Sequence, residues 1–316
     1  MKINTLFESR LDFHNTILVP QYSSLSSRSD VNLYSHKLEL KIPIISAAMD
    51  TVTEKKMQIA MSKAGGLGIH HRYTDTENLK EAVVYGPIAI SPSMGISFIK
   101  SLMEIAKPNY PTFVIDVAHG DSAKALELAA MCVGLGANVW SGNIVTASAA
   151  RRYLDIGVNT LKVGVANGSV CTTSEMAGVG KPQLSAIMDI RMISTSTTII
   201  SDGGVKCAGD IVKALAVGAD AIITGRLFTA CEEAPKISTD NAEYKTYRGM
   251  ASQSALIDAG KEVNVEGVEE RVHHHNKPVS EIISEICAGI KAGMAYCGAK
   301  NVIELREKAE LFLVES

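Results

Sequence analysis

Eight short apolar runs recur along the chain of 316 residues, at intervals of about 26 residues. Each run is rich in Val and Ile and is bounded by Gly, Asp, Asn or Ser. Apolarity within a run is continuous, which indicates strands covered on both faces, as in a parallel sheet. The predicted strands are Ile42–Ala48, Gly66–His70, Pro87–Ser91, Phe113–Ala118, Asn138–Asn143, Thr160–Val165, Thr198–Asp202 and Ala221–Gly225.

Amphipathic stretches fill the intervals, and several open with an N-cap residue, such as Thr53 before Glu54 and Asp121 before Ser122. The predicted helices are Thr53–Lys63, Thr76–Val84, Ile96–Lys107, Ser122–Gly134, Thr146–Ile156, Gln183–Ser194, Lys206–Ala216, Ser280–Ala292 and Asn301–Lys308. Eight strand–helix units predict an α/β fold, a (β/α)8 TIM barrel with residues 1–316 in a single domain. No G-x-G-x-x-G follows the first strand, which disfavours a doubly wound dinucleotide-binding domain.

Composition excludes several classes of protein. Lys and Arg number 31 against 34 Asp and Glu, a net charge of -3, so no basic excess is available to bind nucleic acid. No apolar run approaches the roughly 18 residues of a membrane span, and the first ten residues lack the layout of a secretory signal. Six cysteines without a C-x-x-C pair argue against disulfides or zinc. We expect a cytoplasmic protein with neither nucleic-acid nor membrane partners.

Two connections are longer than the others. The cysteine loop, residues 164–181, follows the sixth strand and is rich in Gly and small polar residues. A long polar segment, residues 226–278, follows the eighth strand, and residues 1–40 form an extension before the first. Extra length after a barrel strand lies at the carboxyl ends of the strands, where barrels carry their active sites. We therefore expect these two connections to be active-site loops.

The loops after the seventh and eighth strands, Ser201–Gly204 and Thr224–Arg226, resemble a phosphate site. Barrels commonly bind phosphate between these loops, and glycines let backbone N–H groups approach the anion. Asp202, at a strand end, would accept hydrogen bonds from sugar hydroxyls. The alternative is that these glycines only form tight turns.

A thiol in the cysteine loop is the candidate nucleophile. Cys171 has small polar neighbours, whereas a structural cysteine is normally buried among apolar ones. Thr173 offers a hydroxyl for proton transfer nearby. Polar residues also end successive strands, namely Asp116, Asn143 and Lys162, and together they favour a ligand site over helix capping.

Histidines occur in two runs, and neither predicts a metal site. His70 and His71 are adjacent within a predicted strand and should point to opposite faces. His273–His275 precede Pro278 in a polar stretch that predicts a solvated turn. We assign no transition metal.

Taken in order along nearly the whole chain, these motifs resemble the IMP dehydrogenase and GMP reductase family. The resemblance is carried by Leu18–Ser23, Ser27–Val31, Ala48–Val52, Gly65–Ile69, Asp116–Gly120, Gly168–Thr173, Gly178–Gln183, Ser201–Gly204, Tyr247–Met250 and Glu266–Val268. It implies a (β/α)8 barrel that assembles as a homotetramer and acts on a purine 5′-monophosphate.

The resemblance also implies residue roles. Cys171 would attack purine C2, with Thr173 and Glu266 handling protons. Asp116 and Asn143 would face a nicotinamide cofactor, NADPH or NADH. Backbone carbonyls of Gly168 and Cys171 would hold a monovalent cation, K+. Substrate would be bound by Ser169, Asp202, Gly203, Gly204, Gly225, Arg226, Tyr247, Gly249, Met250 and Gly267.

The family carries out two reactions, and the sequence favours GMP reductase, which converts GMP and NADPH to IMP, ammonia and NADP. In this family, water cleavage in IMP oxidation uses an Arg-Tyr flap, and residues 251–265 contain neither residue type. The CBS domains of most dehydrogenases are also absent, since Arg72–Ala82 leads directly into the third strand. The alternative is IMP dehydrogenase, which converts IMP, NAD and water to XMP and NADH. Tyr247–Met250, Asp116–His119 and Tyr296–Lys300 look more dehydrogenase-like.

The chain also departs from the family pattern. Ala166-Asn167-Gly168 replaces Gly-Pro-Gly, which puts the cation site in doubt. Ala48, Ser174 and Arg226 are further departures, which raise the hypothesis of a deoxynucleotide or modified purine substrate. Rival interpretations are a flavin-dependent barrel oxidoreductase and a catalytically silent nucleotide-binding protein.

Overall fold

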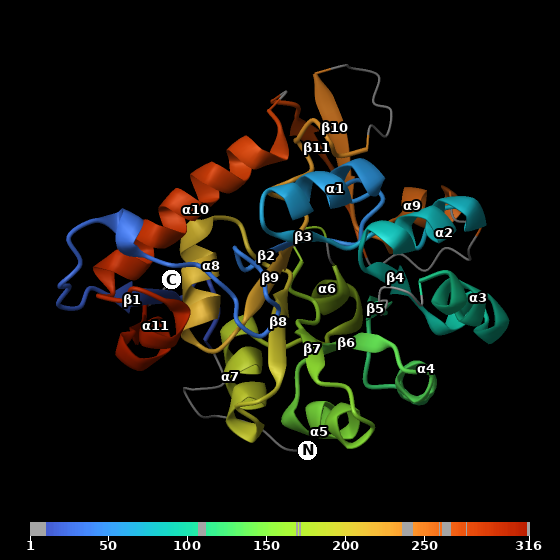
Figure 1. Cartoon of the computed structure of the whole chain (residues 1–316), viewed down its shortest axis with the longest axis horizontal. Coiled ribbons are helices and arrows are strands. Elements are labelled where there is room, and N and C mark those ends of the chain that lie inside the picture. Colours follow the sequence, from blue (N-terminus) through green and yellow to red (C-terminus); the bar gives the residue numbers. More distant parts are fainter. Residues whose placement is uncertain are drawn as a thin grey trace.

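The computed structural model describes residues 11–106, 112–168, 170, 172–235, 243–258, 260, 267–275 and 277–314. In this part of the chain, eight parallel strands form one sheet in the order β3-β2-β9-β8-β7-β6-β5-β4 (Figure 1). The strands are β2 (Ile44–Ser46), β3 (Leu67–Gly68), β4 (Ile88–Ile90), β5 (Thr112–Asp116), β6 (Asn138–Ile144), β7 (Thr160–Val163), β8 (Thr198–Asp202) and β9 (Ala221–Thr224). The predicted (β/α)8 barrel is confirmed.

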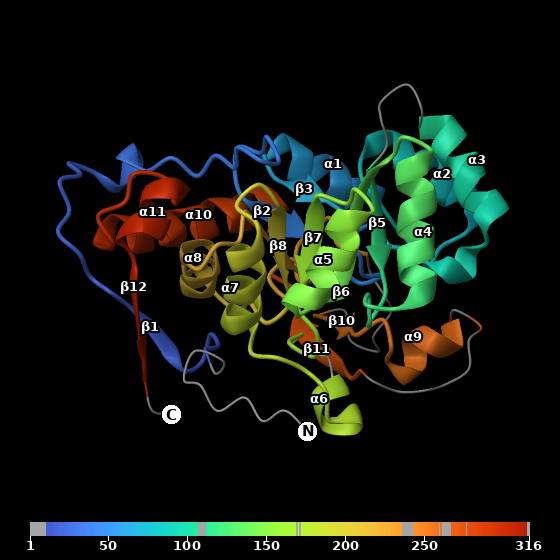
Figure 2. The ribbon, with the colours of Figure 1, turned by 90° about the horizontal axis from the view of Figure 1, so that it is seen from below.

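Helices surround the sheet, and Figure 2 shows them ranged around the strands. They are α1 (Lys55–Lys63), α2 (Thr76–Tyr85), α3 (Ile96–Ala106), α4 (Ala123–Gly134), α5 (Ala147–Asp155), α7 (Gln183–Ile193), α8 (Ala208–Ala216), α10 (Val279–Tyr296) and α11 (Val302–Lys308). Both proposed N-caps are wrong, because the caps are Glu54 and Ser122. The Thr53 hydroxyl donates to Ser46 Oγ at 2.8 Å, and Asp121 pairs with Arg152, so both side chains are engaged elsewhere.

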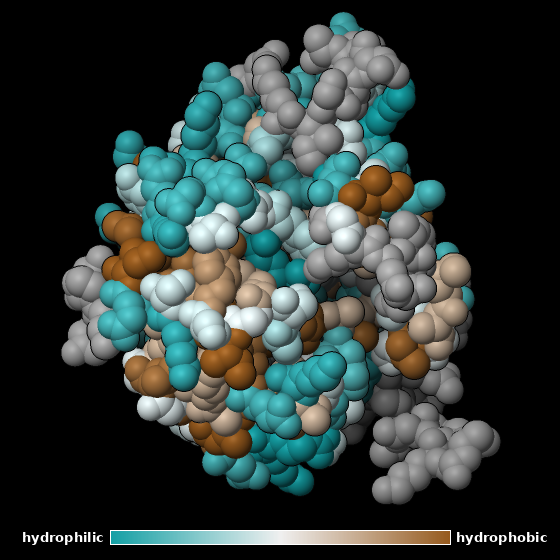
Figure 3. Space-filling model, turned by 90° about the vertical axis from the view of Figure 1, so that its right-hand side faces the viewer, coloured by the Kyte–Doolittle hydropathy of each residue, from teal (hydrophilic) through white to brown (hydrophobic). Residues whose placement is uncertain are grey.

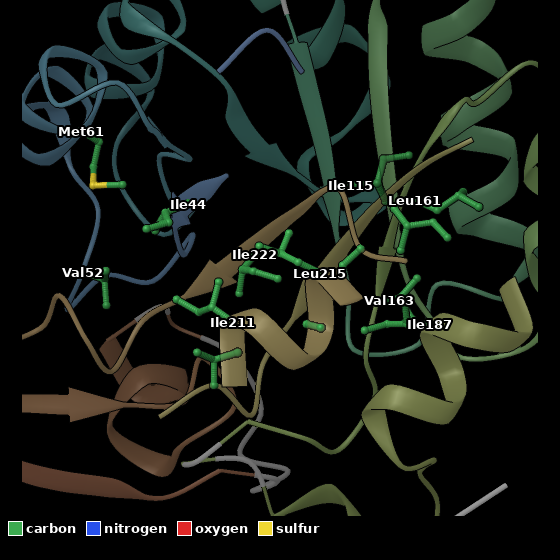
Figure 4. Close-up of a cluster of buried hydrophobic side chains, with 14 of the residues drawn as sticks. Ile44, Val52, Met61, Ile115, Leu161, Val163, Ile187, Ile211, Leu215 and Ile222 are labelled. Carbon is green, nitrogen blue, oxygen red and sulfur yellow. The ribbon is translucent and has the colours of Figure 1, made fainter. Parts of the chain in front are cut away.

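Alternate residues of each strand pack on opposite sides of the barrel wall. In β5, Phe113 and Ile115 join the cluster between sheet and helices, whereas Val114 joins a second cluster inside the barrel. In β2, Ile44 and Ile45 divide in the same way. Figure 4 shows the outer cluster, where side chains from strands meet those from helices. Burial on both sides explains why the strand sequences are continuously apolar.

The barrel closes through His70. Its N–H donates to the Pro87 carbonyl at 3.0 Å, and its carbonyl accepts from the Ala89 N–H at 2.8 Å, which joins β3 to β4. Burial lowers the pKa of His70 to about 4, so the ring is neutral at pH 7. The expectation of opposite faces for His70 and His71 is wrong. Their rings stack, with centroids 5.0 Å apart, because both lie beyond the end of β3.

Two antiparallel ribbons lie outside the barrel. One joins β1 (Thr16–Val19) to β12 (Glu310–Leu313), and the other joins β10 (Tyr244–Arg248) to β11 (Glu269–His273). Neither ribbon was predicted from the sequence. The expected solvated turn at His273–His275 is wrong, since His273 ends β11 and His274 is buried. The remaining short helices are η2 (Arg28–Asp30), η3 (Pro92–Met94), α6 (Thr173–Ala177) and α9 (Gln253–Asp258).

The cysteine loop carries α6, and the segment after β9 carries β10, α9 and β11, at one end of the barrel. Figure 2 shows α6, α9, β10 and β11 on the same side of the strands. Both long connections predicted from the sequence are present, because α6 lies between β7 and α7, and β10, α9 and β11 lie between β9 and α10. The boundaries given for the extension, the cysteine loop and the polar segment remain predictions.

The surface in Figure 3 mixes hydrophilic residues with separate hydrophobic patches. This face carries α2 and α3, whose exposed apolar residues include Val84 and Ile96. Among the helices of the described residues, none combines the length and apolarity that a membrane crossing requires.

At the amino end of the barrel, the buried carboxylate of Asp220 connects three separate parts of the chain. Asp220, directly before β9, is 6% exposed and accepts from Arg191 at 2.6 Å and Arg306 at 2.9 Å. The ammonium of Lys37 lies 3.6 Å away. Arg191 belongs to α7, Arg306 to α11 and Lys37 to the segment before β2. Asp220 therefore holds three separate parts of the chain through one side chain.

Substitution of this carboxylate should be costly. Asp220→Asn keeps the shape but leaves the cations of Arg191, Arg306 and Lys37 without their partner, so we expect a loss of about 3–5 kcal/mol in the free energy of unfolding. Urea denaturation at neutral pH measures it. Asp189→Asn is the control, because Asp189 is half exposed and forms an ion pair with one described residue, Lys181, and the substitution should cost at most about 1 kcal/mol. A similar small loss for Asp220→Asn would contradict this role.

Candidate active site

A cavity of about 310 Å³ opens at the carboxyl ends of the strands. It is lined by residues that follow β2, β5, β6, β8 and β9 together with residues of the two long connections. The predicted site residues on its wall are Asp116, Asn143, Gly168, Thr173, Asp202, Gly203, Gly225, Tyr247, Gly249 and Met250. Residues spread over more than 130 positions of sequence thus meet at one place.

Three predicted residues, Cys171, Ser169 and Glu266, lie outside the described part of the chain. Their sequence neighbours are described. Val170 and Thr173 line the cavity, and the Val170 carbonyl accepts from the Val268 N–H at 3.0 Å. This bond joins the cysteine loop to the segment that precedes β11.

Three further predicted residues are not part of the cavity wall. Gly204 packs near the Asn167 carbonyl and the Phe13 ring. Gly267 pairs with Ser252 beside the cavity. Arg226 forms an ion pair with Glu270, and its side chain is 41% exposed. The Arg226 guanidinium therefore pairs with a residue of β11, and its role in substrate binding remains a prediction.

Buried charges cross the floor of the cavity. Lys162 Nζ lies 2.8 Å from Asp116 Oδ1 and 3.3 Å from Asp202 Oδ2, and Asn143 Nδ2 donates to the same Asp202 oxygen at 3.0 Å. Burial alone would raise the pKa of Asp116, but the Lys162 ammonium and the Arg72 guanidinium outweigh it, so the pKa lies below its ordinary value. Burial also opposes the charge on Lys162, yet the two carboxylates raise its pKa. Asp116 and Lys162 are therefore both charged at neutral pH.

Amide side chains anchor the start of the cysteine loop. Gln183 is fully buried, and its Nε2 donates to the Val163 carbonyl at 2.6 Å and to Ser201 Oγ at 2.9 Å. Its Oε1 accepts from Asn167 Nδ2 at 2.5 Å. Ala166 adopts a left-handed conformation, with φ of 65°, which is uncommon for a residue with a side chain. The unusual Ala166-Asn167-Gly168 sequence is thus accommodated by a bond from Asn167 to the helix that follows the loop.

An arginine that the sequence did not single out closes another side of the site. Arg248, between Tyr247 and Gly249, is 4% exposed. It donates to Asp50 at 2.6 Å and to Asp258 at 2.7 Å. Asp50 lies in the loop after β2, and Asp258 ends α9, so Arg248 joins three connections. The sequence gives one signal for this contact, which is that Asp50 lies in the motif Ala48–Val52 and Arg248 in the motif Tyr247–Met250.

A second cavity, of about 680 Å³, adjoins the first and shares Arg72, Val117 and Ala118 with it. The Arg72 guanidinium lies 4.3 Å from the Tyr73 ring centroid and donates to the Asp116 carbonyl at 3.3 Å. Apart from Arg72, the polar members of its wall are Ser91, Ser93, Lys124 and Glu127, and the other residues are apolar. The two cavities together offer room for two ligands or for one long ligand beside a smaller one.

The chain matches the family model described as IMP dehydrogenase / GMP reductase domain over residues 10–85 and 88–316. Among curated relatives, an inosine-5′-monophosphate dehydrogenase of Borreliella burgdorferi is 31% identical, over 96% of this chain and 93% of the relative. That of Cryptosporidium parvum is 29% identical, over 95% and 90%. That of Helicobacter pylori (strain 26695) is 33% identical, over 93% of this chain and 61% of the relative.

These matches cover nearly every described residue of the barrel and its cavities. The chain therefore belongs to the IMP dehydrogenase / GMP reductase family, a family of oxidoreductases. The resemblance inferred from the motifs is confirmed.

The entry to the cysteine loop should not tolerate a side chain. Gly164 has φ of 147°, and a Cβ there would lie 2.1 Å from the Asp202 carbonyl oxygen. Gly164→Ala should displace the loop, cost about 1–3 kcal/mol in the free energy of unfolding and weaken purine nucleotide binding. Chemical denaturation and calorimetric titration measure both effects.

Gly178→Ala is the matched control. Gly178 also has a positive φ, of 68°, but a Cβ there would meet no atom within 4 Å. This variant should lose only about 1 kcal/mol of stability and keep its nucleotide affinity. Equal nucleotide affinities for Gly164→Ala and Gly178→Ala would show that the close approach of Gly164 to the Asp202 carbonyl does not matter for binding.

Proposed function

We propose that the protein oxidises a purine 5′-monophosphate at C2, with IMP as the substrate, NAD as the hydride acceptor and XMP as the product. The observation that carries this proposal is the gathering of the family's motif residues around one cavity, in a chain whose curated relatives are named inosine-5′-monophosphate dehydrogenase. The sequence favours GMP reductase, but the names of these relatives support the alternative better.

The substrate would lie across the loops after β8 and β9. In the proposal, the phosphate is held by Ser169, Gly203, Gly204, Gly225 and Arg226, of which Gly203 and Gly225 line the cavity. Asp202 accepts hydrogen bonds from the ribose hydroxyls, and the base lies against Met250 and Gly249, which line the cavity. Tyr247 adds a phenol on the same wall, and Gly267 lies beside it.

The residues around the two cavities fit a dinucleotide cofactor. Asp116 and Asn143 line the first cavity, where the nicotinamide end would lie beside the base. The adjoining cavity continues past Arg72 and offers Lys124 and Glu127 to the rest of the molecule. When bound, the oxidised nicotinamide supplies a hydride acceptor.

In the proposed reaction the Cys171 thiolate forms a bond to purine C2, and the hydride leaves from that carbon. The product is a thioimidate, which water cleaves to release XMP and regenerate the thiol. Thr173 and Glu266 would take the protons that water gives up. Thr173 lines the cavity, is 9% exposed and begins α6, and its position on the cavity wall supports this role.

Other inferences from the resemblance remain part of the proposal. These are a homotetramer, a cytoplasmic location, and K+ held by the carbonyls of Gly168 and Cys171. The bond from Asn167 to Gln183 supports the loop without a cation, so we expect K+ to stimulate turnover only weakly.

Turnover in both directions tests the proposal. IMP with NAD should produce reduced nicotinamide, seen by its absorbance, and Cys171→Ser should lower this rate by at least about a thousandfold while nucleotide binding persists. Cys207→Ser is the matched control, since this exposed thiol lies in the loop before α8 and should leave the rate unchanged. Wild-type protein that binds IMP without turnover in either direction would contradict the proposal.

A second candidate function is GMP reduction, which would use GMP and NADPH and release IMP and ammonia. It is supported by the segment 251–265, which contains no Arg and no Tyr for the water step. Consumption of reduced nicotinamide with GMP, together with silence with IMP, would favour this candidate. A comparison of IMP with its deoxynucleotide in the same assay tests the substrate hypothesis raised by Ala48 and Ser174.

A further inference from the structure

The inside of the barrel contains an apolar cluster, although β7 carries a lysine. The inner cluster includes Val114 of β5, Trp140 of β6 and Ile200 of β8. Lys162 pairs with Ile200 in the sheet, and its neighbours Leu161 and Val163 both belong to the outer cluster. The Lys162 side chain therefore projects inward, where it is 2% exposed. A buried ammonium is costly unless carboxylates surround it.

Both carboxylates that surround it belong to the cavity wall, on different sides of it. Asp116 ends β5 and Asp202 ends β8. Each uses one oxygen to accept from Lys162, and Asn143 adds a second bond to that oxygen of Asp202. Within the described residues, the other oxygens, Oδ2 of Asp116 and Oδ1 of Asp202, accept no hydrogen bond. Each carboxylate thus keeps one oxygen available to a ligand.

We infer that Lys162 is a positioning residue whose single ammonium holds Asp116 and Asp202 ionised together, so that the two halves of the site form as one unit. On the proposed function these halves bind the nicotinamide side and the ribose side. Without Lys162, two carboxylates would share a buried space, and one of them would take up a proton. A protonated carboxyl group is a weaker hydrogen-bond acceptor than a carboxylate, so it binds a ribose hydroxyl less well.

Other groups near this network do not replace the ammonium. Arg72 donates to the main-chain carbonyl of Asp116 and lies against the Tyr73 ring. Asn143 is uncharged, and Tyr247 faces the cavity from β10. Arg72 and Lys162 are the cations that line this cavity within the described residues. Lys162 is the one in contact with both carboxylates.

The pH dependence of stability distinguishes this role from simple packing. In Lys162→Met the two carboxylates lose their shared counter-ion, so one carboxyl group of the pair should keep its proton to a pH above the unfolded pKa of about 3.9. A carboxyl group with a raised folded pKa contributes stability below the unfolded pKa and loses it as pH rises through the folded pKa. The deficit in thermal midpoint relative to wild type should therefore grow between about pH 5 and about pH 8. A deficit independent of pH would overturn the proposal.

A double variant isolates the shared charge. Lys162→Met with Asp116→Asn removes the like-charged neighbour of Asp202, so the pH-dependent part of the deficit should largely disappear. Lys162→Arg, which keeps the charge, should also show little pH dependence. If Lys162→Met does not fold but the double variant does, the result supports the proposal. Failure of both to fold would overturn it, because loss of the second carboxylate should relieve the repulsion.

Nucleotide binding gives the second measurement, by calorimetric titration of IMP, or of GMP if IMP does not bind. Lys162→Met should weaken affinity about tenfold or more at about pH 5, where one carboxyl group of the pair is protonated, and less at about pH 8. The double variant should regain affinity to within about threefold of wild type, although cofactor turnover stays low. A double variant as weak as Lys162→Met would overturn the proposal. A silent wild-type enzyme would refute the proposed function, yet the unfolding and binding measurements would still decide the role of Lys162.

Discussion

The structure depends on burial of both faces of every barrel strand. Alternate residues such as Ile44 and Ile45 serve the outer and inner clusters, so the strands leave little room for polar chemistry except where they end. Asp116, Asn143 and Asp202 stand at those ends and meet at one cavity. The long connections after β7 and β9 complete the wall. The fold therefore determines where the site can be before any particular ligand is considered.

Buried charge occurs at both ends of the barrel, with opposite arrangements. At the amino end, one carboxylate, Asp220, receives cations from three parts of the chain. At the carboxyl end, one cation, Lys162, lies between two carboxylates. The first arrangement has excess positive charge and its groups are bonded among themselves, which suits a structural tie. The second has two carboxylates for one ammonium, and among the described residues each carboxylate has one oxygen that accepts no hydrogen bond, which suits ligand binding.

Much of this organisation can be predicted from the sequence, because periodic apolar runs and loop length are local signals. The strand at 198–202 is predicted to the residue, and the long loops are located correctly. Contacts between distant residues are less accessible. Arg226 pairs with Glu270, and Arg248 with Asp50, choices that no local pattern reveals. The start of α1 is also missed, since Thr53 bonds to Ser46 at the end of β2 rather than capping its own helix.

Closure of the barrel through His70 makes one place in the ring unlike the others. β3 has only two residues, and two main-chain hydrogen bonds at a single residue complete its link to β4, whereas β5 and β6 pair over five positions. Fewer bonds must break there for neighbouring strands to separate, so local opening should begin at this seam. The ring is thus continuous in space but uneven in strength, and its amides next to His70 should exchange with solvent before those between β5 and β6.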